Sequence, residues 1–156
     1  MNETALRREQ LFEQIGLQQR LFSKEQVEGA RHIARQRGQP LGDVLVVQGF
    51  LSPEQCRGLE RAVTYRLGRD EDKEVAKIII ESHYCAPERV EEALREQKQH
   101  YSRTGELVRL STLLLRNEAI TESQKIAAEK IHGIEQQSAS GSGQRARGGR
   151  RGVPPF

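Results

Sequence analysis

Four segments of the chain share one order of apolar and polar positions, and this order is typical of the start of an α-helix. In each segment two apolar residues precede a small or polar residue, and a glutamate follows within the next two positions. The segments are 21–27, 50–56, 84–90 and 119–125. A pattern that recurs in this way indicates a repeat architecture, in which each unit contributes one helical building block.

The residues at these four positions suit helix initiation. Ser23, Ser52 and Thr121 are each followed three residues later by a glutamine, which is the spacing of a capping box. Pro53 and Pro87 fall at the first helical position, where a missing amide hydrogen is not needed and the fixed φ already suits a helix. The residues after each cap then keep the apolar spacing of a one-sided helix. We therefore predict four long helices.

Shorter apolar segments lie before three of these caps, at 41–47, 75–80 and 110–115. Apolar residues in the first and third recur at helical spacing, so we predict short helices. The β-branched residues Val46 and Val47 and the run 78–80 leave a strand as the alternative, because such residues are common in strands.

Together these elements predict an all-α fold. It consists of four short-helix, turn, long-helix units stacked over residues 1–136, each covering its neighbour's apolar stripe. Loops are expected at 38–40, 68–72 and 104–105, where glycine, proline and charged residues gather. From residue 137 onward serine, glycine, arginine and proline replace the apolar period, so we expect 137–156 to be a disordered tail.

The charge distribution separates this tail from the helical region. The tail holds four arginines and no acidic residue, and without them the 25 basic residues of the chain fall to 21, against 22 acidic ones. A nearly neutral helical region does not predict nucleic-acid binding by that region. The favoured interpretation of the tail is a solubilising, unstructured terminus, and the alternative is phosphate contact by the tail arginines Arg145, Arg147, Arg150 and Arg151.

Other features of the composition bear on location. The two cysteines do not form a metal-binding or redox motif, and we find no signal-peptide pattern and no apolar run long enough to cross a bilayer. We therefore expect a cytoplasmic protein that does not insert into membranes.

Residues 41–55, together with the helix ending at 91–97, resemble the N-terminal helical repeat domain of type II secretion and type IV pilus assembly ATPases. The ATPase is absent from this chain, which has no phosphate-binding loop motif. The resemblance covers about residues 40–130 and is best in the second unit. It implies a helical repeat domain that works within a bacterial secretion, pilus, motility or signalling assembly.

Some members of that family bind cyclic di-GMP through an arginine and a Leu-Gly turn. Leu41, Gly42 and Gly49 match this motif in the second unit, and Arg109 and Leu110 match it in the fourth. The resemblance implies that these five residues contact the ligand. The motif's arginine position is proline at residue 40, and its glycine positions in the fourth unit are Ser111 and Glu118.

The remaining candidate chemistry predicts neither a metal site nor an enzyme. Cys56, His83, Cys85 and His100 lack paired ligand spacing, and the acidic run 70–72 lacks the alternation of a calcium loop. We interpret that run as a solvated turn.

We find no catalytic residues and expect no cofactor. The primary hypothesis is a non-catalytic module that binds another protein. The alternatives are a cyclic di-GMP receptor and a weak nucleic-acid binder that acts through the tail.

Overall fold

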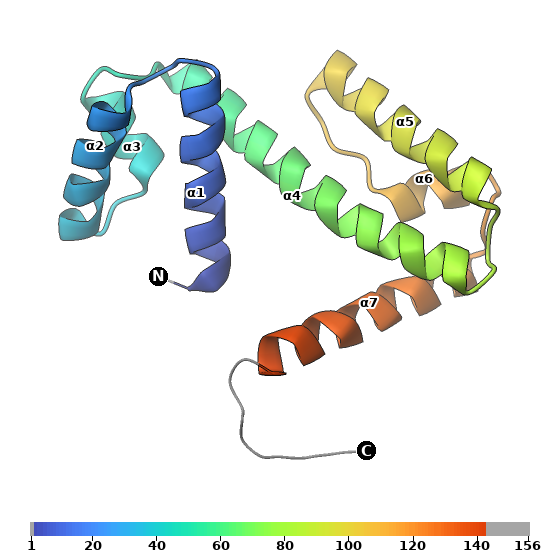
Figure 1. Cartoon of the computed structure of the whole chain (residues 1–156). Helices are drawn as coiled ribbons and strands as arrows, with labels where there is room; N and C mark the ends of the chain where they lie inside the picture. The colour runs from blue at the N-terminus through green and yellow to red at the C-terminus, as the bar shows by residue number, and fades with distance from the viewer. Residues whose placement is uncertain (1, 143–156) are drawn as a thin grey trace. The chain divides into compact units, whose positions relative to one another are not determined.

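The computed structural model describes residues 2–142, with side chains as far as residue 137. Within this range the chain forms seven helices and no strand, which confirms the all-α prediction (Figure 1). The segments 41–47 and 110–115 are helical, so the strand alternative is wrong for both. The helices are α1 (Glu3–Gln18), α2 (Lys24–Arg37), α3 (Leu41–Val47), α4 (Pro53–Glu81), α5 (Pro87–Thr104), α6 (Leu110–Arg116) and α7 (Glu122–Ser142).

The predicted capping boxes are present. The Ser23 hydroxyl accepts a hydrogen bond from the Gln26 amide at 3.1 Å, and the Gln26 side chain accepts one from the Ser23 amide at 2.9 Å. The same reciprocal pair joins Ser52 to Gln55 and Thr121 to Gln124. Two backbone N–H groups that a helix start leaves free are satisfied each time, which sets the starts of α2, α4 and α7.

The loop expected at 68–72 is wrong, because α4 runs without a break from Pro53 to Glu81. Gly68 lies inside this helix, and its missing side chain leaves room for the Leu107 side chain, which a Cβ at Gly68 would strike. The segment 75–80 is accordingly the last part of α4 rather than a separate short helix. Gly68 therefore serves close packing and not a turn.

The boundary expected at residue 136 also differs from the structure, because α7 continues to Ser142. Residues 143–156, where disorder was predicted and where the four tail arginines lie, are outside the described residues.

The chain divides into two units. Among the described residues, unit 1 comprises 2–68 together with Thr104–Leu107, and unit 2 comprises Arg69–Arg103 and 108–142. Each unit has its own apolar core. In unit 1 the core includes Phe12, Ile15, Val27, Ala30, Leu41, Leu45, Leu51, Leu59 and Val63. In unit 2 it includes Val75, Ile78, Ile79, Val90, Ala93, Leu110, Leu113, Leu114, Ile120 and Ala128.

Unit 1 and unit 2 repeat one local plan. Each of them contains two of the four helix pairs that the sequence predicts. Helix, turn, helix, short helix and helix follow one another in each, as α1, α2, α3 and the start of α4, and as the end of α4, α5, α6 and α7. The turns agree in backbone conformation: Arg20 and His83 both adopt positive φ, at 58° and 59°, and so do Gly49 and Glu118, at 82° and 59°. The chain therefore contains two copies of one helical plan.

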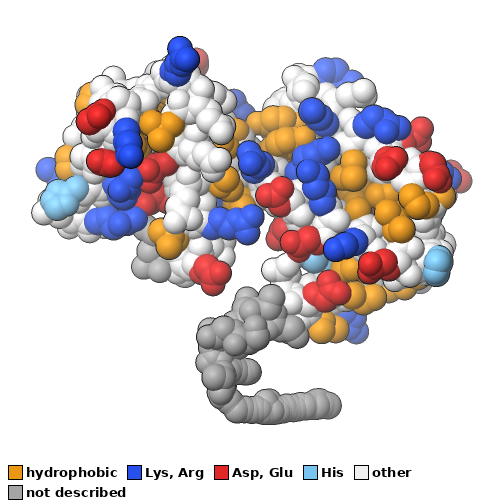
Figure 2. Space-filling view, in the orientation of Figure 1, with side chains coloured by type: hydrophobic (Ala, Val, Ile, Leu, Met, Phe, Trp, Pro, Cys, Tyr) orange, Lys and Arg blue, Asp and Glu red, His pale blue; other side chains and the backbone are white. Residues whose placement is uncertain are grey.

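The surface of each unit carries charged side chains of both signs, with small groups of hydrophobic side chains between them (Figure 2). Four large hydrophobic residues are exposed among the described side chains: Leu6, Val47, Ile126 and Ile134. Ile126 and Ile134 are eight residues apart on α7, which places them on a similar face of that helix.

Candidate functional site

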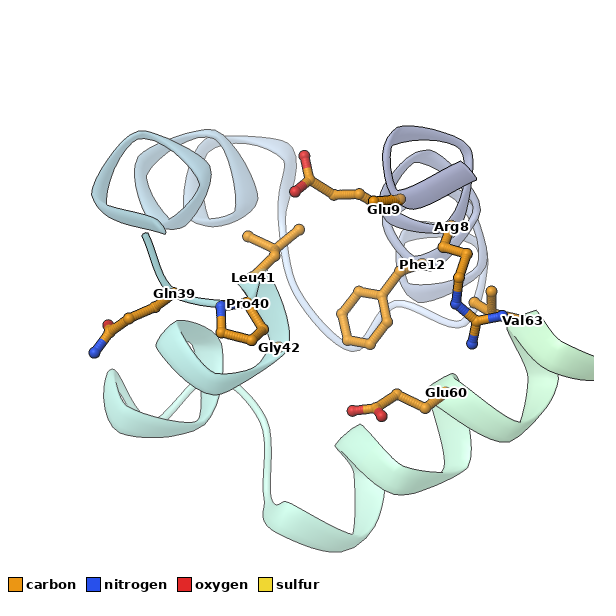
Figure 3. Close-up of a pocket in the computed structure, with 10 residues that line it drawn as sticks. Arg8, Glu9, Phe12, Gln39, Pro40, Leu41, Gly42, Glu60 and Val63 are labelled. Carbon is orange, nitrogen blue, oxygen red and sulfur yellow. The ribbon is translucent and has the colours of Figure 1, made fainter. Parts of the chain in front are cut away.

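A pocket of about 380 Å³ lies in unit 1 between α1, α3 and α4 (Figure 3). Its position follows from the short loop 38–40, which ends α2 at a left-handed glycine and turns the chain directly into α3. The lining residues are Ala5, Arg8, Glu9, Phe12, Gln39, Pro40, Leu41, Gly42, Glu60 and Val63.

The floor of this pocket is apolar and its rim is charged. Phe12, Leu41 and Val63 belong to the core of unit 1 and are 7%, 5% and 1% exposed. Figure 3 shows the Phe12 ring pointing from α1 into the space that Glu60 faces from α4. Arg8 and Glu9 complete the rim from α1. An apolar floor with a few polar groups around it is typical of a ligand or peptide site.

Two of the rim groups are held by neighbours. Arg8 donates a hydrogen bond to the Thr64 hydroxyl at 3.0 Å, and Glu9 pairs with Arg35 at 2.7 Å. Both contacts join separate helices, because Arg8 and Glu9 lie on α1 whereas their partners lie on α4 and α2. The rim is therefore partly ordered before any ligand binds.

The third rim group, Glu60, contacts a buried thiol. The Cys56 Sγ lies 3.4 Å from the Glu60 carboxylate and donates to it. Burial, reinforced by this hydrogen bond and by the charge of Glu60, raises the pKa of Cys56 to about 11. Cys56 is therefore protonated near neutral pH, which is unfavourable for nucleophilic chemistry.

A second pocket of about 350 Å³ adjoins the first, since Arg8 and Glu60 line both. It also lies within unit 1. Its other lining residues are Arg57, Arg61, Thr64, Gly105 and Leu107. Three arginines and one glutamate thus surround this space.

Of the five residues that the family resemblance indicates, only Leu41 and Gly42 line the first pocket. A Cβ at Gly42 would lie 2.7 Å from the Cys56 sulfur and 3.2 Å from the Phe12 ring, so the missing side chain makes room for the protein's own packing. Gly49 follows α3 with φ of 82° and has no atoms within 4 Å of its Cβ position. Gly49 is thus explained by its turn conformation.

Arg109 and Leu110 lie in unit 2, where they bind Asp72. The Arg109 guanidinium donates to the Asp72 carboxylate at 3.0–3.3 Å and to Glu71 at 3.1 Å, and the Leu110 amide donates to Asp72 at 2.9 Å. Burial alone would lower the pKa of Arg109, but the hydrogen bonds and charges of Asp72 and Glu71 outweigh it and raise the pKa. This arginine already has an internal counter-ion.

Asp72 is the centre of a buried polar network, so the solvated turn expected at 70–72 is wrong for this residue. Asp72 is 3% exposed, and Gln97, which is fully buried, donates to it at 2.6 Å and to the Val108 carbonyl at 2.9 Å. Arg69 in turn donates to Gln97 at 3.1 Å. The carboxylate tolerates burial because each of its oxygens accepts hydrogen bonds.

The sequence did not predict the arginines and glutamates of the two pockets. A usable signal was present in Arg57 and Arg61, which are one helical turn apart after a clear cap and therefore share a face. Arg8 could not be added, because its place beside α4 depends on the packing of α1.

The described residues include no group of three or more metal-ligating side chains that could hold a metal ion. Both cysteines are free thiols. Among the helices in this part of the chain, none combines the length and the apolar character required to cross a membrane. Comparisons with protein-family models, with curated proteins and with solved structures give no match to this chain.

Proposed function

We propose that this protein is a non-catalytic interaction module whose unit 1 docks a partner protein. The observation that supports it is the pocket between α1, α3 and α4, which has a core-derived apolar floor and a charged, partly ordered rim. Such a surface can bury an apolar anchor while the rim orients the rest of the partner. We further propose that it works within a bacterial secretion, motility or signalling assembly, as the resemblance of residues 41–55 implies.

The chemistry of the pocket supports binding in preference to catalysis. Its thiol neighbour, Cys56, has a pKa raised to about 11 by burial and by Glu60. Glu9 is paired with Arg35, and Arg8 with Thr64. These side chains already have partners within the protein. A general base or nucleophile, in contrast, must be free, activated and able to reach a substrate.

The proposal is tested by blocking the pocket from its rim. Ala5 is exposed and lines the pocket, so Ala5→Trp places a large side chain over the opening without entering the core. Gln14→Trp adds the same side chain to the opposite, exposed face of α1 as a matched control. In affinity capture from cells of the source organism, followed by mass spectrometry, the unaltered chain and Gln14→Trp should retain a protein that Ala5→Trp loses. Retention of the same proteins by all three would contradict docking at this pocket.

Cyclic di-GMP binding is the second candidate, favoured by the fact that Leu41 and Gly42 line the pocket beside Arg8. Binding there would depend on Arg8, since Arg109 is already bound by Asp72 in unit 2. In calorimetric titrations Arg8→Ala should then abolish the binding heat, whereas Arg109→Ala should leave it unchanged. The absence of heat with the unaltered protein would remove this candidate.

A further inference from the structure

The second pocket of unit 1 gathers positive charge from two helices. Arg57 and Arg61 lie one turn apart on α4, and Arg8 reaches the same space from α1, where Thr64 accepts its hydrogen bond at 3.0 Å. Arg61 passes beside Gly105, whose Cβ position would lie 3.5 Å from the Arg61 Nε. Glu60 is the single acidic residue in the lining. The lining thus has a net positive charge.

Arg57 and Arg61 differ in their pairing from three arginines that have an acidic partner. Arg31 pairs with Glu13 at 2.6 Å, Arg35 with Glu9, and Arg109 with Asp72. In contrast, neither Arg57 nor Arg61 forms an ion pair or hydrogen bond with another residue of the described range. Two neighbouring guanidinium groups repel each other weakly, so their presence here offers the fold no evident gain in stability.

The repeated plan indicates that the fold does not require this cluster. Ser52 and Thr121 cap the corresponding helices α4 and α7, so Arg57 and Arg61 correspond to Ile126 and Lys130 of unit 2. Arg20 and His83 are equivalent turn residues. Arg8 of α1 and Glu71 of α4 lie equally far before them in the sequence, so Arg8 corresponds to Glu71. Unit 2 forms the same helices without the three arginines.

We propose that unit 1 binds an acidic peptide segment of a partner protein, with an apolar side chain in the first pocket and neighbouring carboxylates on Arg57, Arg61 and Arg8. This inference rests on the proposed docking function and specifies its ligand. The pockets share Arg8 and Glu60, so adjacent residues of one peptide can occupy both. Arginine binds carboxylates through paired N–H donors, which adds directional specificity to charge attraction.

Glu9 and Glu60 on the rim favour a peptide over a cyclic dinucleotide. Both carboxylates line the first pocket, where they would repel a phosphodiester but not the apolar side chain and neutral backbone of a peptide, whose carboxylates lie on the arginines of the second pocket. The aromatic surface available for stacking a base is limited to Phe12, which is 7% exposed. A peptide with one apolar anchor fits these conditions.

The experiment selects peptides from a random phage-displayed library on the full chain and measures the best binders as labelled synthetic peptides by fluorescence anisotropy. Selected peptides should carry Asp or Glu next to Leu, Ile or Phe. The double variant Arg57→Glu with Arg61→Glu should weaken their binding by roughly tenfold or more, and increased ionic strength should weaken it as well. Arg66→Glu, an exposed arginine on the same helix outside both linings, should change it by less than about twofold.

Each contrary result separates the ligand from the docking function. If the selected peptides are neutral or basic and Ala5→Trp weakens their binding, the inference of an acidic ligand is wrong, whereas the docking function is supported. Equal binding by the charge-reversed variant, or no selected peptide at all, would also overturn the inference, while the capture experiment still judges the docking function on its own. Cyclic di-GMP binding that is lost in the double variant would identify a nucleotide as the occupant instead. Circular dichroism of each variant confirms that it is folded.

Discussion

Asp72 shows how one buried carboxylate can hold three segments of unit 2 together. It lies in α4, accepts from Gln97 of α5, and accepts from the Arg109 side chain and the Leu110 amide at the start of α6. An ionised group that is 3% exposed is tolerated only when donors replace water. The network therefore fixes the entry into α6.

Asp72→Asn tests this role. The change keeps the shape of the side chain but removes the charge that Arg109 faces and presents an amide N–H₂ where only donors converge. We expect the free energy of unfolding to fall by about 2 kcal/mol. This loss is smaller than that usual for breaking a fully buried ion pair, because Arg109 is partly exposed. Urea denaturation measures it. Glu71→Gln, whose carboxylate is about half exposed, is the control and should change the free energy of unfolding by less than about 0.5 kcal/mol. Equal effects of the two changes would contradict a special role for Asp72.

Cys56 gives a prediction about pH. Burial raises its pKa from 9.0 to about 11, so between these values the folded state binds the proton that the unfolded state has released. The stability that this thiol contributes is therefore complete below pH 9 and is lost as the pH rises through 11. Below pH 9 the thiolate fraction should be about a hundredfold lower in the native protein than in urea. Iodoacetamide alkylation at pH 8.5, followed by mass spectrometry, should show slow labelling of native Cys56. Labelling as fast as in urea would contradict the raised pKa.

At the scale of the elements, the turns after α3 and α6 differ in how their shared conformation is achieved. Both require a residue with positive φ, and the chain supplies Gly49 in one and Glu118 in the other. The same three backbone hydrogen bonds close each turn, from Gln48, Gly49 and Phe50 and from their counterparts Asn117, Glu118 and Ala119. A residue with a Cβ is strained in this region, whereas glycine is not.

Reciprocal substitutions measure this strain. Glu118→Gly should raise the free energy of unfolding by about 0.5–1 kcal/mol, because relief of the left-handed strain exceeds the entropy that glycine adds to the unfolded chain. Gly49→Ala should lower it by about 1 kcal/mol, although nothing lies within 4 Å to obstruct the new methyl group. Thermal or urea unfolding measures both, and opposite signs from those stated would show that contacts, rather than φ, decide these turns.

The sequence predicted the elements that local chemistry determines and missed those that depend on distant residues. The capping boxes at Ser23, Ser52 and Thr121 involve residues three positions apart, so they were readable. The segment 68–72 looked like a loop because its partners, Leu107 for Gly68 and Gln97 with Arg109 for Asp72, are far away in the chain. The pocket arginines were missed for the same reason, since Arg8 meets α4 only through packing.

For the whole molecule, the important feature is that the apolar residues form two separate cores. Each core consists of residues from one unit, and the boundary between the units falls at Gly68, within α4. Hydrophobic stabilisation is proportional to apolar area removed from water, so each unit gains most of it from its own core. Units with separate cores can open locally with different free energies.

Two matched core truncations test whether the units open separately. Leu45 of α3 and Leu114 of α6 occupy corresponding positions and are 0% and 1% exposed. Each change to alanine should cost about 2–4 kcal/mol through lost burial and the cavity that remains. In native-state hydrogen exchange, Leu45→Ala should increase exchange mainly in unit 1 and Leu114→Ala mainly in unit 2, with the change in α4 occurring near Gly68. If either substitution raised exchange uniformly through both units, the two cores would unfold as one cooperative body. The loss of stability in one core would then reach the other through α4. Exchange confined to one unit would mean that the docking surface of unit 1 can be altered while unit 2 stays folded.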